Sequence, residues 1–142
     1  MVVVVLELRR HQWLEMLAEA WDSYPLEGCG LLVGASGAEA VERFVPIRNE
    51  ARSSRIYRLD GSQYAKAAVQ ADRDGLDIIG VMHSHTHTAA YPSPTDVAEA
   101  SKPLVPPDWH WVIVSLGWGY PELHSFRILD GGIAEEPVVL AN

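Results

Sequence analysis

A strongly apolar segment, Leu76 to Met82, runs without a break into the tripeptide His83-Ser84-His85. Its β-branched residues Ile78, Ile79 and Val81 predict a buried central strand. Side chains alternate along a strand, so histidines at positions i and i+2 project from the same face. The chain must therefore adopt a fold in which a central strand delivers two imidazoles to one place.

Patterns of apolar residues predict further strands on both sides of this segment. They cover residues 2–8, 28–34, 41–47, 109–116, 122–129 and 133–140, with a short extended piece at 56–59. Turn signals separate them, and no internal repeat, long linker or low-complexity segment interrupts the chain. We expect residues 1–142 to form a single α/β domain with a mixed, mainly antiparallel sheet flanked by helices.

Three helices are predicted between these strands. Trp13, Leu14, Leu17 and Trp21 recur at helical spacing and indicate the first. The second is expected to begin at Asp60 as N-cap, with Gln63 as its capping-box partner, and to end at Gly75. The third opens on Ser93-Pro94-Thr95-Asp96, with a serine N-cap, proline at the first helical position and an acidic residue at the third.

Charge and cysteine content exclude several classes of function. The formal net charge of -8 and the pI near 5.1 argue against binding of nucleic acid or of an anionic membrane surface. The apolar run at residues 1–8 lacks a preceding basic region and is too short to span a bilayer. Cys29 is the only cysteine, so the chain has no internal disulfide. This suits a reducing compartment, and we expect a cytoplasmic protein. We expect Cys29 itself to lie in the core.

Asp96 adds an anionic group to the histidine pair. It lies in the first turn of the helix that follows the loop after His85, where its carboxylate can point back to the strand end. Two imidazoles and one carboxylate form the kind of catalytic zinc site that keeps a fourth position open for water. A His-x-His pair on its own is equally compatible with a structural role, so the wider pattern has to decide.

That wider pattern is His83-Ser84-His85, seven residues, Ser93, two residues and Asp96, with Glu27 upstream in Pro25-Leu26-Glu27-Gly28-Cys29-Gly30. It resembles the JAMM motif of the MPN+ metalloproteases. The resemblance implies an MPN (cytidine-deaminase-like) core fold and one zinc ion per chain, held by His83, His85 and Asp96. It also implies that Glu27 shuttles protons and that Ser93, besides capping its helix, donates to the oxyanion.

Other segments resemble one branch of this family. Residues 49–53, 57–60 and 90–93 are similar to the bacterial Mec-like peptidases, which release cysteine from the ubiquitin-like sulfur carrier protein CysO. The likeness implies cleavage of an amide bond at the carboxyl end of a small carrier protein with a Gly-Gly tail. It leaves open the carrier, the residue released, the pathway and the oligomeric state, a homodimer included.

Four arginines in an eleven-residue window suggest how such a substrate is held. Arg48, Arg52, Arg55 and Arg58 are the exception to the acidic composition. One interpretation is a solvated loop face. The other is that an arginine binds the free carboxylate of the attached amino acid with paired hydrogen bonds, with Arg52 and Arg58 preferred because they lie in the subfamily-like segments.

Two competing functions remain. The first is a non-catalytic MPN scaffold, against which the intact motif argues. The second is a deubiquitinase-like isopeptidase, although the short connections leave no room for insertions that grip ubiquitin. The remaining residues of note are assigned to structure: His87 to a loop at the mouth of the site, His11, His110 and His124 to structural positions, and Trp109, Trp111, Trp118 and Tyr120 to packing and turns.

Overall fold

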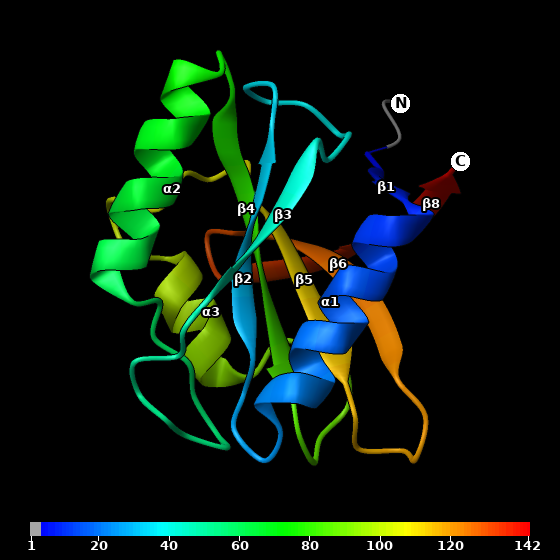
Figure 1. Cartoon of the computed structure of the whole chain (residues 1–142). Helices are drawn as coiled ribbons and strands as arrows, with labels where there is room; N and C mark the ends of the chain where they lie inside the picture. The colour runs from blue at the N-terminus through cyan, green and yellow to red at the C-terminus, as the bar shows by residue number, and fades with distance from the viewer. Residues whose placement is uncertain (1–3) are drawn as a thin grey trace.

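The computed structural model describes residues 4–142 and contains a six-stranded sheet with helices on both faces (Figure 1). The strand order is β3-β2-β4-β5-β6-β7, and only the β4–β5 pair is parallel. The elements in chain order are β1 (Leu6–Arg9), α1 (Arg10–Ser23), β2 (Cys29–Gly34), β3 (Arg43–Ile47), α2 (Gly61–Arg73), β4 (Asp77–His85), α3 (Pro94–Ala100), β5 (His110–Ser115), β6 (Glu122–Leu129), β7 (Gly132–Glu136) and β8 (Val138–Ala141). The expected mixed, mainly antiparallel sheet is confirmed.

Alternating side chains of the central strands build a separate core on each face of the sheet. On one face α1 packs its buried residues against Leu32, Met82 and Val112. On the other face α2 and α3 cover Leu31, Val81 and Ile113. Strand β4 lies between β2 and β5 and is buried from its second residue to its last, as the apolar pattern predicted. The sheet therefore fixes the end of β4, with its two histidines, from both sides.

The buried face of α1 agrees with the predicted one at Leu17 and Trp13 but not at Leu14 and Trp21. Leu14 and Trp21 are 51% and 49% exposed, while Gln12, Met16 and Ala20 are buried. These three positions are four residues apart and form one row on the helix. Gln12 enters the core because its side-chain amide donates to the Val41 carbonyl at 2.8 Å, which satisfies a polar group that apolar periodicity alone places outside.

The predicted strand at 133–140 is two strands. Pro137 separates β7 from β8, because proline has no N–H to donate to a ladder. Strand β8 leaves the main sheet and pairs in parallel with β1. The first strand was predicted at 2–8, but β1 spans Leu6–Arg9, and residues 1–3 lie outside the described part.

Helix α2 begins as predicted, with one difference. The Asp60 carboxylate accepts from the Gln63 N–H at 2.9 Å, which confirms the N-cap. The Gln63 side chain instead accepts from the backbone N–H of Arg48 at 2.7 Å, so it joins the helix to the preceding loop rather than closing a capping box. Within residues 4–142, no helix is both long and apolar enough to cross a membrane.

Candidate metal centre

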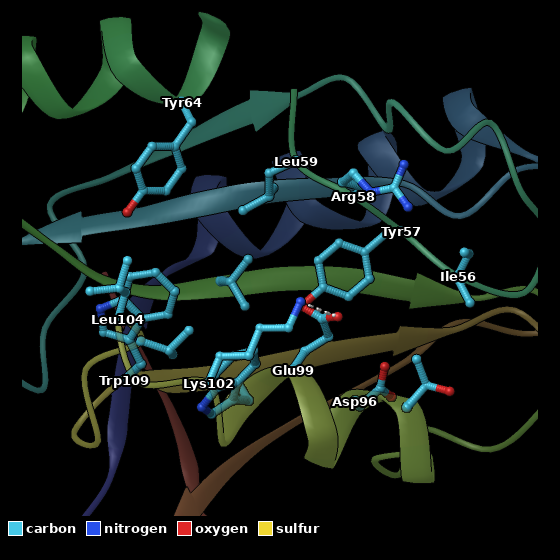
Figure 2. A pocket seen from close by; sticks show the side chains of 14 residues that line it. Ile56, Tyr57, Arg58, Leu59, Tyr64, Asp96, Glu99, Lys102, Leu104 and Trp109 are labelled. Atoms are coloured by element: carbon cyan, nitrogen blue, oxygen red, sulfur yellow. Dashed lines mark ion pairs between the residues drawn. The ribbon is translucent and has the colours of Figure 1, made fainter. Parts of the chain in front are cut away.

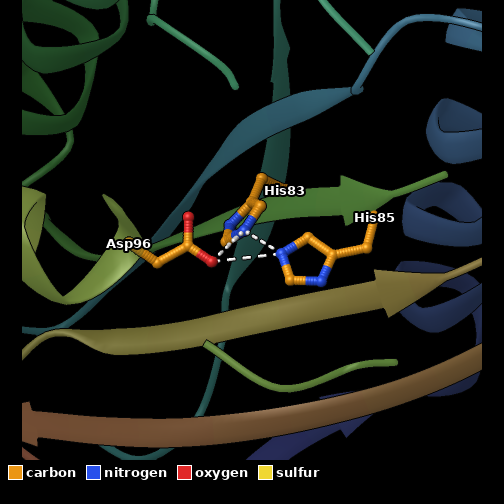
Figure 3. Close-up of side chains that lie close together, drawn as sticks. All are labelled: His83, His85 and Asp96. Carbon is orange, nitrogen blue, oxygen red and sulfur yellow. Dashed lines mark hydrogen bonds and ion pairs between the residues drawn. The ribbon is translucent and has the colours of Figure 1, made fainter. Parts of the chain in front are cut away.

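Three side chains converge at the end of β4. The Nε2 atoms of His83 and His85 lie 3.1 Å apart, and each lies 3.1 Å from Oδ2 of Asp96 (Figure 3). All three residues are buried, with 1%, 5% and 6% of their surfaces exposed. The sequence pattern predicts that these residues lie together, and the fold brings one ring nitrogen of each histidine and one carboxylate oxygen to one point.

Hydrogen bonds orient two of these groups. Ser93 caps α3 with its hydroxyl oxygen, which accepts from the Asp96 N–H at 3.1 Å, while the Ser93 N–H donates to Asp96 Oδ2 at 2.9 Å. The His85 ring donates from Nδ1 to the Ala89 carbonyl at 2.7 Å, so in the neutral ring the Nε2 lone pair faces the cluster. The Ser93 cap thus orients the carboxylate of Asp96, and the Ala89 carbonyl fixes the tautomer of His85.

This donor set fits a divalent metal ion. Ligands about 2.0–2.1 Å from a tetrahedral metal are about 3.3 Å apart, close to the separations seen here. Although burial opposes its charged form, hydrogen bonds from His83 and His85 hold the pKa of Asp96 well below its usual range, and burial lowers the pKa of His83. An ionised carboxylate and a neutral imidazole are the forms that bind metal.

His85 differs from His83 in its protonation. Burial works against its charged form, but hydrogen bonds to Asp96 and to the Ala89 carbonyl raise the pKa of His85. A raised pKa is expected of an imidazole that faces a carboxylate, and a cation at the same point competes with that proton. Metal binding at this cluster is therefore expected to weaken as the pH falls.

The loop between β3 and α2 holds two parts of the site. Tyr57 stacks on the His83 ring, with centroids 4.4 Å apart and planes inclined by 18°. Asn49 is buried and donates from Nδ2 to the Glu27 carbonyl and to the Ile56 carbonyl, both at 3.0 Å. The same side chain accepts from the N–H groups of Ala51 and Arg58 through Oδ1. One amide therefore fixes the loop against the segment that carries Glu27.

Glu27 lies beside this cluster and is only 4% exposed. Its backbone N–H donates to the Ser53 carbonyl at 2.8 Å, and the next N–H, of Gly28, donates to the Ser84 hydroxyl at 2.7 Å. Burial raises the pKa of Glu27 to about 7, with His85 lowering it and Asp96 raising it further. A carboxyl group with a pKa near neutrality can both accept and release a proton.

A pocket of about 410 Å³ adjoins Asp96 on the face of the sheet covered by α2 and α3 (Figure 2). Its lining is mainly apolar and includes Tyr57, Leu59, Tyr64, Val105, Trp109 and Trp111. Glu99 and Lys102 form an ion pair of 2.9 Å across it, and Leu104 beside them is 97% exposed. The pocket therefore reaches the cluster at one of its three residues, Asp96.

The arginines surround the site without touching the cluster. Arg58 lines the pocket, and Arg52 adjoins Ser53, whose carbonyl holds Glu27; both are exposed. Arg48 pairs with Asp60 at the start of α2, and Arg55 lies in the exposed part of the loop. Arg52 has a φ of +47°, a left-handed conformation that a turn imposes on the chain there. Arg52 and Arg58, the two arginines predicted to bind a substrate carboxylate, therefore lie near the site on the same loop.

Among the other singled-out residues, Cys29 is fully buried, and burial raises the pKa of its thiol to about 12. His87 is exposed on the loop after β4, and its Nδ1 lies 2.9 Å from the Thr86 hydroxyl rather than in the cluster. Of the aromatic residues assigned to packing and turns, Trp109 and Trp111 are buried, while Trp118 and Tyr120 lie in the turn between β5 and β6 and are 58% and 61% exposed.

Of the three histidines assigned to structural positions, one is buried and two are at least partly exposed. His110 is buried and its Nδ1 lies 2.6 Å from the Glu136 carboxylate, so its structural role is clear. His11 is exposed and 4.0 Å from Glu15, and His124 is partly exposed beside Glu135. Sequence reasoning missed Asn49, Tyr57 and Ser84 as parts of the site. Their signal was weak, because an asparagine or tyrosine in a loop shows no partner until the chain folds.

Comparison with known proteins agrees with this geometry. Residues 9–129 match the family described as prokaryotic homologs of the JAB domain. The chain is 41% identical over 138 residues to the CysO-cysteine peptidase of Mycobacterium tuberculosis, which covers 96% of this chain and 91% of that protein. It is 35% identical over 108 residues to a probable TtuB-protein conjugate cleaving protease of Thermus thermophilus, covering 75% of this chain and 65% of that one.

A solved structure shows the same fold. The solution structure of protein DSY2949 from Desulfitobacterium hafniense superposes with a TM-score of 0.84 at 32% identity, covering 97% of this chain and 94% of that one. A mixed sheet whose central strand ends in His-x-His, opposite an aspartate on a capped helix, is the arrangement of a JAB/MPN domain. This chain belongs to the prokaryotic JAB/MPN family.

Proposed function

We propose that this chain is a zinc peptidase with one zinc ion per chain. In this proposal it hydrolyses the amide bond between the C-terminal glycine of a ubiquitin-like sulfur carrier protein and an attached amino acid, with cysteine the first candidate. Its place would be the biosynthesis of cysteine or a related sulfur metabolite in the cytoplasm. The convergence of His83, His85 and Asp96 beside the buried carboxyl of Glu27 carries the proposal, and the CysO-cysteine peptidase relative supports the substrate class.

The chemistry divides between the ion and the chain. When bound by His83, His85 and Asp96, zinc supplies a Lewis acid that polarises the scissile carbonyl and acidifies water. The Glu27 carboxylate accepts a proton from the attacking water as the C–O bond forms, and delivers it to the leaving amine as the C–N bond breaks. The products are a carrier with a free C-terminal carboxylate and the free amino acid.

Ser93 would stabilise the oxygen of the attacked carbonyl. Its hydroxyl oxygen accepts from the Asp96 N–H, so the hydroxyl proton remains available to donate. A hydrogen bond that strengthens as negative charge develops lowers the barrier more than it strengthens substrate binding. We therefore assign Ser93 two functions, helix cap and oxyanion donor.

Arg52 and Arg58 are proposed to bind the carboxylate of the attached amino acid. Both are exposed, both lie in the loop that holds Glu27 and Tyr57, and guanidinium groups pair with carboxylates through two parallel hydrogen bonds. Replacing either by alanine should raise KM for a carrier–cysteine adduct far more than for an adduct with an amidated end. Equal effects on the two substrates would exclude this role.

The substrate assignment is tested with sulfur carrier proteins from the same genome. Adducts carrying a C-terminal cysteine are incubated with the zinc-loaded protein, and intact-mass measurement is expected to show loss of one residue. Carriers joined to a lysine of another protein test the isopeptidase alternative, which the name of the Thermus relative favours. Cleavage of the second substrate alone would support that alternative, and cleavage of neither would point to a non-catalytic scaffold.

A further inference from the structure

The charge of this acidic chain is distributed unevenly. Residues 43–73, which comprise β3, the following loop and α2, carry seven Lys and Arg residues against three Asp and Glu residues. The rest of the chain carries four basic and sixteen acidic residues. One continuous structural unit is therefore basic in a molecule whose formal net charge is -8.

Most of the positive charge in this unit is not neutralised locally. Arg43 pairs with Asp74 and Arg48 with Asp60. The other five have no ion-pair partner among residues 4–142, and all are exposed: Arg52, Arg55, Arg58, Lys66 and Arg73, here called the basic surface. Lys66 and Arg73 are seven residues apart on α2, so they share one face of the helix.

One member of the basic surface, Lys66, lines a groove at the edge of the sheet. Strand β3 is the edge of the six-stranded sheet, and a groove of about 440 Å³ separates it from α2. Four apolar residues line this groove together with two cations and two side-chain amides: Val45, Pro46, Ile47, Ala67, Arg43, Lys66, Gln63 and Gln70. Apolar contact area with charges at its border is the composition of a protein interface.

The same unit leads to the metal centre. The Arg48 N–H is bound to Gln63 of α2, and Arg58 lines the pocket that ends at Asp96. Figure 1 shows the β3–α2 loop at the end of the molecule towards which β4 points, with α2 rising beside the sheet. A partner held on α2 and β3 therefore lies next to the loop that borders the pocket.

We propose that the basic surface and the β3–α2 groove dock an acidic face of the carrier protein's folded body, while its tail occupies the pocket beside Asp96. This inference rests on the proposed function and adds to it how the carrier is recognised. Complementary charge mainly accelerates association and selects the partner. A nucleic acid fits less well, because sixteen acidic residues elsewhere would repel a long polyanion.

The test compares two charge reversals that change the net charge equally. Lys66→Glu alters the basic surface on α2, and Arg10→Glu alters an exposed cation on α1, at the opposite face of the sheet. Each variant is assayed with a full carrier–cysteine adduct and with a short peptide that contains only the carrier's tail and its cysteine. Thermal melting establishes that both variants are folded.

We expect Lys66→Glu to raise KM for the full adduct roughly fivefold, with kcat and the peptide reaction unchanged, and Arg10→Glu to change neither. The KM effect should nearly vanish at about 1 M salt, where the Debye length is about 3 Å. Equal effects of the two reversals, equal effects on adduct and peptide, or no effect would overturn the docking surface. So would binding of duplex DNA by the wild type but not by Lys66→Glu, with carrier kinetics unchanged.

Failure of the proposed function would look different. If the wild type cleaves neither substrate, the peptidase assignment is wrong, and calorimetric binding of the intact adduct to the wild type and to Lys66→Glu decides the docking surface alone. Weaker binding to the variant would support it, and equal binding or none would overturn it.

Discussion

Glu27 illustrates how a single residue acquires chemistry from its surroundings. Glutamate is usually exposed, and here a buried strand follows it while the loop at 49–58 covers it, so its carboxyl is desolvated beside His85 and Asp96. Desolvation raises the pKa of Glu27 towards neutrality, as a group that passes protons in both directions requires. The motif alone identifies Glu27 as a candidate, but the surroundings that raise its pKa are seen only in the folded chain.

Glu27→Gln should separate metal binding from turnover. The amide keeps the shape of the side chain but cannot accept a proton, so kcat should fall by about 10²–10⁴-fold while the metal content by elemental analysis stays the same. Glu19→Gln is the matched control, because Glu19 is a neighbouring carboxyl whose pKa burial also raises. A Glu27→Gln variant with wild-type kcat would remove this residue from the mechanism.

Ser93 can be separated into its two functions by two substitutions. Ser93→Ala loses both the cap and the hydroxyl, so we expect kcat to fall about 10²–10³-fold and stability by about 1 kcal/mol. Ser93→Gly also loses the hydroxyl, but glycine at an N-cap costs only a few tenths of a kcal/mol. The two variants should therefore share the loss of kcat and differ in melting temperature. An unchanged kcat in both would reduce Ser93 to a cap.

At the scale of the elements, local sequence patterns predicted which helices and strands form better than they predicted where each one begins and ends. The buried run of β4 and the serine cap of α3 are coded by adjacent residues, so the approach of His83, His85 and Asp96 could be anticipated. The break at Pro137 is local, because it comes from a proline that cannot donate to a ladder, but the inward turn of Gln12 and the bonds of Asn49 depend on partners far along the chain. Periodicity carries no information about such partners.

The conformation of the loop at 49–58 should depend on the side chain of Asn49. Asn49→Ala removes four hydrogen bonds of 3.0 Å and one of 3.5 Å and leaves buried backbone groups without partners, so we expect a loss of about 2–3 kcal/mol in stability and a lower kcat. Gln63→Ala is the control, since it removes one exposed hydrogen bond from the same loop. Chemical denaturation and steady-state kinetics measure both. Similar stability and kcat in the two variants would contradict a special role for Asn49.

On the scale of the whole molecule, two clusters of buried polar side chains lie at opposite ends of one sheet. One contains His85, and the other contains His110 and Glu136. His85, at the metal end, lies beside Ser115 at the end of β5, whereas His110 begins that strand. There the Glu136 carboxylate lies 2.6 Å from His110 and accepts from Ser125 at 2.8 Å and Arg127 at 2.9 Å. His110 Nε2 also lies 3.0 Å from the Ala38 carbonyl, so the network joins three strands and a turn.

This distal network should govern stability at acid pH without affecting the site. Burial tends to raise the pKa of Glu136, but hydrogen bonds from His110, Arg127 and Ser125 outweigh it and hold that pKa below 4.5. A carboxyl whose pKa is lower in the folded state stabilises the fold fully above its unfolded pKa, and this stabilisation is lost as the pH falls through the folded value. Glu136→Gln should thus cost about 2–3 kcal/mol at pH 7, and its deficit relative to the wild type should shrink as the pH falls below 4.5.

The neighbouring residue provides the control for this substitution. Glu135→Gln removes a partly exposed carboxylate that lies 2.9 Å from His124, a surface contact of little energetic weight, and should change stability by less than about 1 kcal/mol. Urea unfolding between pH 3 and 7 and metal content at pH 7 measure both variants. His110, which contacts Glu136, and the proposed metal ligand His85 lie at opposite ends of the β4–β5 pair, so folded Glu136→Gln should bind metal as the wild type does. A pH-independent deficit would contradict the stabilising role of the ionised Glu136 carboxylate, and a loss of metal in the folded variant would show that the two ends of the sheet are coupled.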